Sequence, residues 1–306
     1  MIRTFLVAAA VTLTAPADLP PDSAVKPIEV LKTGDYSEGV VVDHDGNLFF
    51  SHGKIVTKVY LKGPKKSDTW AETGSPNGHK ILADGTHLIC DASKHAVLHL
   101  DDESREMAAE SLESDGKPLR APNDLTLDTP NGGVYFTDPG GSSDEKPIGT
   151  VHYIDSKRVT HTIAEGLAFP NGIVLRPGGK ELLVGESKKN RILVFPVLAP
   201  GKLGDPKVLV ELPKKGEGQT DNQPDGIALD AEGNLYVAHY GMKQVQVISP
   251  EGKVIRRYAG GNQTTSNVCF AGPKMDQLYL TGGDPGALFR LDLGVKGLTI
   301  LPPKGK

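Results

Sequence analysis

The sequence of 306 residues lacks the features that mark several protein classes. It has no excess of basic residues: 34 Lys and Arg against 38 Asp and Glu give a formal net charge of −4. A chain with this balance has no electrostatic reason to bind nucleic acid or an anionic membrane surface. It has two cysteines, Cys90 and Cys269, in parts of the chain that should not be neighbours, although an exported protein could form a disulfide. Both lie in apolar, strand-like contexts, and we expect them to be buried free thiols.

Long apolar runs and helical periodicity are also missing. The apolar run near the N-terminus is too short to span a membrane, so we expect no membrane span. One Arg precedes that run, and "APA" at 15–17 fits a small-residue cleavage site. We therefore predict a signal peptide over 1–17, a linker over 18–27, and export to the periplasm or the medium. The alternative is a disordered or buried N-terminal strand.

Glycine and proline are plentiful, at 36 and 23 residues, which favours many turns and an all-β fold. One phrase recurs six times: a polar residue usually followed by Gly, an apolar strand, a polar turn, and a second strand. Residues 170–187 read "PNGIVLRPGGKELLVGES", and residues 224–240 read "PDGIALDAEGNLYVAHY". The leading polar residues are Glu38, Asn77, Asn123, Asn171, Asp225 and Asn267.

Six repeats, each long enough for four short strands, predict a six-bladed β-propeller over 28–306 with four-stranded antiparallel blades around a central channel. The strand at 28–34 should complete the last blade and close the ring. The first strand of each blade lines the channel, so the six leading polar residues should converge on one rim. The second strand returns to that rim, and we expect its end residues to lie nearby: His52, Asp91, Asp138, Glu186 and His239.

The six leading positions are two carboxylates and four amides, all of which offer oxygen. Oxygen ligands suit a hard cation such as Ca²⁺, whereas Zn²⁺ favours Cys and His. The alternative is that Asn-Gly and Asp-Gly simply form turns at the blade starts. That alternative explains Asn77 but not Glu38, because Glu is a poor turn residue. The pattern alone leaves both interpretations open.

Over about residues 28–300 the chain resembles the senescence marker protein-30/gluconolactonase family. The resemblance rests on an ordered set of phrases: "SEGVVVD", "APNDLTLD", "VYFTDP", "FPNGIVLRPGGKELLVGES", "QPDGIALDAEGNLYVAHY" and "TSNVCFAG". It implies one divalent metal, commonly Ca²⁺ but with Mg²⁺, Mn²⁺ or Zn²⁺ possible, held by Glu38, Asn171 and Asp225. It also implies that Asn123 contacts the substrate and that Asp225 is the catalytic acid/base. Some members carry an Arg just before the third-blade Asn, so Arg120 is a candidate although its spacing differs.

The implied activity is hydrolysis of a lactone. A bound cation polarises the ring carbonyl, while Asp225 takes a proton from the attacking water. We expect Asn77, Asn123, Arg120 and His239 to hold substrate hydroxyls. The alternatives are that His239 only lines the channel, that Arg120 is a solvated charge, and that Asp138 stabilises a turn. No "GxSxG" motif supports a serine hydrolase.

Two other functional classes stay open. One is a non-catalytic scaffold of the NHL-repeat type, and the other is a metal-dependent hydrolase of aryl esters or organophosphates on the same fold. The expected partner is a small-molecule lactone, and no obligate protein partner is inferred. Substrate specificity is expected to depend on loops over the channel mouth, such as those at 140–149 and 213–223.

Overall fold

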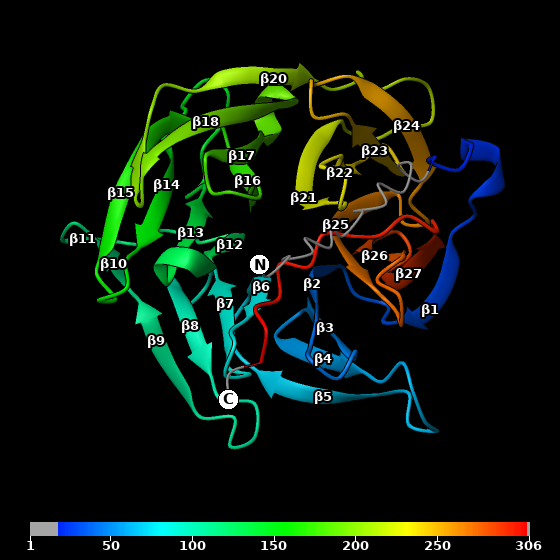
Figure 1. Cartoon of the computed structure of the whole chain (residues 1–306), viewed down its shortest axis with the longest axis horizontal. Helices are drawn as coiled ribbons and strands as arrows, with labels where there is room; N and C mark the ends of the chain where they lie inside the picture. Colours follow the sequence, from blue (N-terminus) through cyan, green and yellow to red (C-terminus); the bar gives the residue numbers. More distant parts are fainter. Residues whose placement is uncertain (1–17, 305–306) are drawn as a thin grey trace, which may run out of the picture.

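A computed structural model describes residues 18–304 and shows six β-sheets arranged around a central axis (Figure 1). The six-bladed propeller predicted from the repeats is therefore confirmed. The predicted signal peptide at 1–17 lies outside the described residues. Within residues 18–304 the helical segments are three 3₁₀ turns, and no helix there is long and apolar enough to cross a membrane. These turns are η1 (Asp22–Ala24), η2 (Thr129–Asn131) and η3 (Ser187–Lys189).

The blades follow one another in chain order, and the first strand of each lies nearest the axis (Figure 1). Blade four carries a short extra strand, and a small hairpin lies between blades two and three. The strands are β2 (Ser37–Val42), β3 (Leu48–His52), β4 (Ile55–Val59) and β5 (Ser67–Glu72) in blade one; β6 (Pro76–Ile81), β7 (His87–Asp91), β8 (Ala96–Leu100) and β9 (Met107–Ser111) in blade two; β12 (Leu125–Asp128), β13 (Gly133–Asp138), β14 (Gly149–Ile154) and β15 (Thr160–Leu167) in blade three; β16 (Pro170–Leu175), β17 (Glu181–Glu186), β18 (Arg191–Ala199), β19 (Lys202–Leu203) and β20 (Lys207–Glu211) in blade four; β21 (Gln223–Leu229), β22 (Leu235–Tyr240), β23 (Gln244–Ile248) and β24 (Val254–Ala259) in blade five; β25 (Thr264–Ala271), β26 (Gln277–Gly283) and β27 (Ala287–Asp292) in blade six; and β10 (Glu113–Ser114) with β11 (Lys117–Pro118) in the hairpin.

The two ends of the chain meet in blade six. Strand β1 (Ile28–Lys32) pairs antiparallel with β27 and forms the outer strand of that blade, as predicted from the sequence. The segment at 18–27 lies against blade five: the Tyr258 hydroxyl donates to the carbonyl of Pro20 at 2.8 Å, and Val25 is buried in the core. This pairing covers the outer edge of β27 and ties the N-terminal strand to the last repeat.

The hydrophobic core is divided among the blade interfaces. Six clusters of buried side chains are found, and each joins two neighbouring blades, including the pair formed by blades six and one. A single four-stranded sheet has two apolar faces and cannot cover both alone, so each blade is stabilised by its neighbours. The two cysteines are free thiols, with Cys90 fully buried and Cys269 partly buried.

A bulge near the start of the first strand turns the leading polar residue toward the axis. In five blades the register with the second strand shifts there, as between Glu38 and Val41 in blade one. The following Gly is required by close approach of the next blade: a Cβ on Gly39 would lie 1.8 Å from the carbonyl oxygen of Asn77. The polar-Gly pair is therefore part of a bulged strand and not of a turn.

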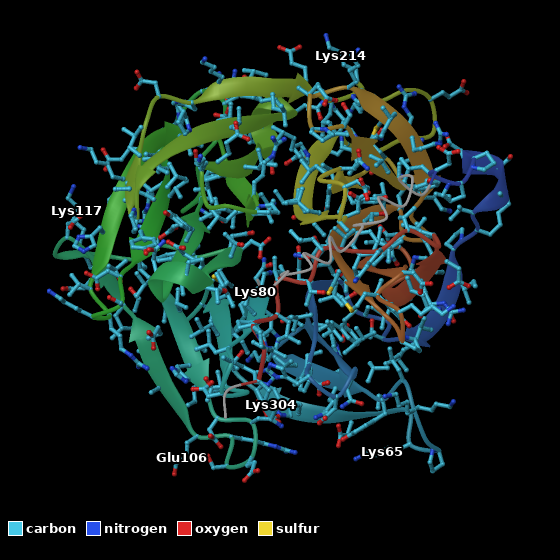
Figure 2. The ribbon with its side chains drawn as sticks, viewed as in Figure 1. Lys65, Lys80, Glu106, Lys117, Lys214 and Lys304 are labelled. Atoms are coloured by element: carbon cyan, nitrogen blue, oxygen red, sulfur yellow. The ribbon has the colours of Figure 1, made fainter. Side chains whose placement is uncertain are left out.

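The opposite end of the channel is apolar and closed by the C-terminal segment. Leu298, Ile300 and Leu301 line this end together with first-strand residues. The backbone N–H of Leu298 donates to the carbonyl of Leu229 at 2.9 Å, which holds the segment across the channel (Figure 1). Lys80 lies near the centre of the ring (Figure 2). The polar rim at the other end is thus the open mouth of the channel.

Candidate functional site at the channel mouth

The polar residues that lead the blades converge as expected. A pocket of about 450 Å³ opens at the axis, and we term it the axial pocket. Five of the six leading residues line it: Glu38, Asn77, Asn123, Asn171 and Asp225. Asn267 is not part of the lining; its Oδ1 accepts the backbone N–H of Val268 at 2.8 Å, and its side chain lies beside Glu38, whose pKa it lowers.

Glu38 is held in an asymmetric environment at the pocket floor. Its Oε1 accepts a hydrogen bond of 2.7 Å from the Tyr36 hydroxyl. Its Oε2 is buried and has no hydrogen-bond partner among the described residues. Burial, which disfavours the charged form, raises the pKa of Glu38 to about 7. One carboxylate oxygen is thus fixed by a hydrogen bond, and the other has no hydrogen-bond partner among the described residues.

Asp225 is a second buried carboxyl group at the same floor. Burial raises its pKa well above the ordinary value, and the charges of Glu38 and Asp124 add to this rise. Asp124 is also buried, which raises its own pKa, and its carboxylate lies 3.8 Å from the Lys80 ammonium. Sequence reasoning missed Asp124. The available indication was that blade three has "PND" where blades two and four have "PNG".

These groups fit a hard divalent cation. Two buried carboxyls with raised pKa values repel one another, and the Oε2 of Glu38 and the Oδ1 of Asn123 are buried without partners in the described part of the chain. Residues 18–304 contain no group of three or more His, Cys, Asp or Glu placed to hold a metal. A cation here would therefore be held by two carboxylates completed by amide oxygens, a set that suits Ca²⁺ better than Zn²⁺.

Most of the wall of the axial pocket comes from residues that the sequence analysis did not name. Tyr36 and Tyr240 meet edge to face at a centroid distance of 6.3 Å. The Lys188 ammonium lies 5.7 Å from the centre of the Phe169 ring. The loop at 213–223 supplies Asp221 and Gln223 to the wall, whereas the loop at 140–149 contributes no lining residue.

The residues expected at the ends of the second strands do not line the axial pocket. Asp138 accepts the backbone N–H groups of Arg120 and Ala121 at 2.7 and 2.9 Å, which fixes the loop that leads into blade three. Asp91 and Glu186 accept backbone N–H groups of their own blades in the same way. Asp138 is therefore a turn-stabilising residue, as one interpretation of the sequence had it.

Two predicted substrate-binding residues are not at the axial pocket. His239 is fully buried, and both nitrogens of its ring have hydrogen-bond partners within blades four and five. Nε2 bonds to Asn190 Oδ1 at 2.9 Å, and Nδ1 bonds to the Gln246 amide at 3.1 Å. Arg120 lines a separate pocket over blade three. The prediction that these two side chains hold substrate hydroxyls at the channel mouth is not retained. Asn77 and Asn123 stay candidates for that role.

Comparison with known proteins places the chain in a family. Residues 36–284 match the SMP-30/Gluconolactonase/LRE-like region. The chain belongs to this family. It is 30% identical over 284 residues to a gluconolactonase of Zymomonas mobilis, covering 83% of this chain and 78% of the relative. It is 30% identical over 281 residues to lactonase drp35 of Staphylococcus saprophyticus, covering 87% and 84%. A diisopropyl-fluorophosphatase of Loligo vulgaris is 22% identical over 283 residues, covering 84% and 88%.

Solved structures show the same fold. A gluconolactonase of Xanthomonas campestris superposes with a TM-score of 0.76 at 20% identity, covering 92% of this chain and 99% of that one. A calcium-binding protein, regucalcin, of Agrobacterium tumefaciens superposes with a TM-score of 0.74 at 20% identity, covering 90% and 98%. At 20% sequence identity, the structural similarity establishes the fold alone.

Proposed function

We propose that this protein hydrolyses a lactone and uses one divalent cation, Ca²⁺, held by Glu38, Asn171 and Asp225. The observation that carries the proposal is the pair of buried carboxyl groups at the axial pocket, one of which has an oxygen without a partner among the described residues. Burying two like charges side by side is costly unless a cation compensates them. Membership of the SMP-30/gluconolactonase family, with lactonases among the relatives, supports the choice of substrate.

When bound, the cation would polarise the carbonyl of the lactone and stabilise negative charge on its oxygen. Asp225 is placed at the pocket floor, 5% exposed, where its carboxylate can accept the proton of an attacking water. Asn123 presents a buried amide oxygen without a partner in residues 18–304, and Asn77 lines the same pocket. These two amides would orient the ring by hydrogen bonds to its hydroxyl groups.

The aromatic wall of Tyr36, Tyr240 and Phe169 suits a flat or chair-shaped ring of the size of a sugar lactone. Hydrolysis of an organophosphate is the second candidate, because one relative is a diisopropyl-fluorophosphatase and the same cation chemistry serves phosphoryl and carbonyl centres. The two relatives named as lactonases are more similar to this chain, which favours the lactone. A non-catalytic scaffold has no need for buried carboxylates on its axis.

The test is a panel of lactones, with diisopropyl fluorophosphate beside it, assayed by proton release on metal-stripped protein and after addition of each metal. Ca²⁺ is expected to restore lactone turnover. Asp225→Asn should lower turnover by roughly 10² or more, and excess Ca²⁺ should not restore it. The exposed Asp205→Asn variant is the matched control for loss of one carboxylate.

Other outcomes assign the site differently. Rescue of Asp225→Asn by saturating Ca²⁺ would make Asp225 a metal ligand only. Unchanged turnover and thermal stability in that variant would remove it from the mechanism altogether. Turnover of the organophosphate alone would replace the proposed substrate class, and no turnover of any substrate with tight Ca²⁺ binding would favour a calcium-dependent binding protein.

A further inference from the structure

Phe169, in the wall of the axial pocket, has an unusual backbone conformation. Its φ is +62°, and within residues 18–304 it is the one aromatic residue with a positive φ. A bulky side chain is strained at such a value. Pro170 follows, and a residue before proline prefers an extended backbone with a φ of about −120°. Gly at this position would avoid the strain, so the aromatic side chain needs a reason.

Neither the repeat nor the hydrophobic core explains this conformation. The residues at the same position in the other blades, two before the leading polar residue, all lack a positive φ: Tyr36, Ser75, Ala121, Gln223 and Thr265. Phe169 is partly exposed and belongs to none of the six hydrophobic clusters. Its ring lines the axial pocket, with the Lys188 ammonium 5.7 Å from the ring centre. Strain that holds a side chain in place is typical of functional sites.

The turn at 167–169 is held in this conformation by hydrogen bonds to its backbone. The Ala168 N–H donates to Glu186 Oε1 at 2.8 Å. Two N–H groups of η3 donate to the carbonyls of Ala168 and Phe169, at 3.1 and 3.0 Å. The Phe169 N–H donates to the Ser142 hydroxyl oxygen at 3.2 Å. All the backbone donors and acceptors of these two residues are therefore bonded, which allows a strained conformation to persist.

Ser142 is the partner of this turn that comes from a different blade, since Glu186 and η3 belong to blade four. Ser142 is buried, and a hydroxyl group has one donor and two acceptor sites. Its O–H donates to the carbonyl of Leu167 at 2.6 Å, and its oxygen accepts the N–H groups of Phe169 and Ile148 at 3.2 and 3.0 Å. All three sites are thus used, and two of them hold the turn.

Ser142 lies in the link between β13 and β14, which is unusually long in blade three. Residues 139–148 form this link, whereas the longest corresponding links in the other blades are 92–95 and 187–190. The extra length reaches the neighbouring blade four (Figure 1). A second contact is the ion pair of Asp144 with Lys189 of η3, at 3.0 Å. The loop at 140–149 therefore supports the wall of the axial pocket from outside, although it lines none of it.

From this geometry we infer that Ser142 is a positioning residue for the substrate of the axial pocket. Its hydroxyl keeps the turn at 167–169 in the left-handed conformation, and the turn keeps the Phe169 ring in the wall against which a lactone ring packs. Without this hydroxyl, Phe169 relaxes to a negative φ and its ring leaves the wall. The effect on the substrate rests on the proposed hydrolysis, whereas the position of the ring can be observed without turnover.

The kinetic test uses D-glucono-1,5-lactone with Ca²⁺ in the buffer. Ser142→Ala should raise KM about tenfold, the scale of one aromatic contact, and should change kcat less than about twofold, because Ser142 does not line the pocket. Ser143→Ala is the matched control and should change neither constant, because the Ser143 hydroxyl accepts only the N–H of Lys146 within the same loop. With an active wild type, an unchanged KM in Ser142→Ala would overturn the inference.

A double-mutant cycle tests whether Ser142 acts through Phe169. Phe169→Gly removes the ring and should raise KM by a similar factor. Adding Ser142→Ala to Phe169→Gly should raise KM no further, and a further rise of the same size would show that Ser142 acts by another route. Phe169→Gly should also melt at a higher temperature than Phe169→Ala, which keeps the strained backbone. Equal melting temperatures would show that no strain is held at this position.

Crystal structures give a readout that needs no substrate. In the Ser142→Ala protein, Phe169 should have a negative φ and its ring should lie outside the axial pocket, whereas Ser143→Ala should leave both unchanged. A ring in its wild-type place in Ser142→Ala would refute the positioning role, whether or not a lactone is hydrolysed. Absence of turnover in the wild type would refute the proposed function alone. If Ser142→Ala fails to fold, Ser142→Cys decides, because a thiol of similar size accepts an N–H only weakly.

Discussion

Replacing Glu38 by Gln should make the metal-free protein more stable while it destroys the proposed cation site. Glu38 has a pKa of about 7 in the folded protein, against 4.5 for an ordinary glutamate. The folded state therefore binds its proton more tightly than the unfolded chain does. As the pH rises from about 4.5 to 7, this carboxyl group costs increasing stability, and above pH 7 the cost is constant at about 3 kcal/mol, an upper limit for one group.

Gln keeps the size of the side chain and an oxygen that can accept the Tyr36 hydroxyl, but it carries no charge. In metal-free buffer at pH 8, Glu38→Gln should therefore raise the free energy of unfolding by up to about 3 kcal/mol. Near pH 4.5 the two proteins should be about equally stable, because Glu38 is then largely protonated. The loss of the neighbouring charge should also let Asp225 ionise at lower pH.

Calcium should reverse this order of stability. Ca²⁺ at a hundred times its dissociation constant stabilises the wild type by about 2.7 kcal/mol, whereas a variant with one carboxylate left should gain much less. Denaturant unfolding with chelator, and again with Ca²⁺, measures both effects. Glu232→Gln, an exposed glutamate in a turn, is the control and should change neither. A Glu38→Gln protein that is less stable than the wild type without metal at pH 8, or that gains as much from Ca²⁺, would refute the reasoning.

Three further predictions follow from local features. Gly39→Ala should lower the free energy of unfolding by about 3 kcal/mol or more, because its Cβ would overlap the next blade; Gly178→Ala, also at positive φ but with open space around it, should lose only the cost of backbone strain. Tyr36→Phe should weaken Ca²⁺ binding about tenfold, because the glutamate ligand loses its anchor; calorimetry tests this against Tyr240→Phe, which keeps that hydrogen bond. Export remains a proposal: N-terminal sequencing of protein from the native host should give a chain that begins near Asp18, and an intact Met1 in a cytoplasmic fraction would contradict it.

The architecture could be predicted from the sequence alone, because each repeat carries its own pattern of strands and turns. Alternation of apolar residues defines each strand, and Gly-rich turns separate the strands. The sixfold recurrence then defines the blades. The pairing of the 28–34 strand with the last blade followed from counting strands, and the convergence of Glu38, Asn171 and Asp225 followed from their shared register.

Only the tertiary structure decided where individual side chains point once a strand has ended. Arg120 and His239 lie close to the rim in sequence register, but their side chains bind Thr150 and Asn190 and do not line the axial pocket. Asp124 takes a glycine position and so brings a third carboxyl group near the pocket. These contacts join residues that are far apart in the chain, within blade three for Arg120 and between blades four and five for His239. A periodic pattern records which face of a strand is buried, but it carries no information about which neighbour fills the space beside it.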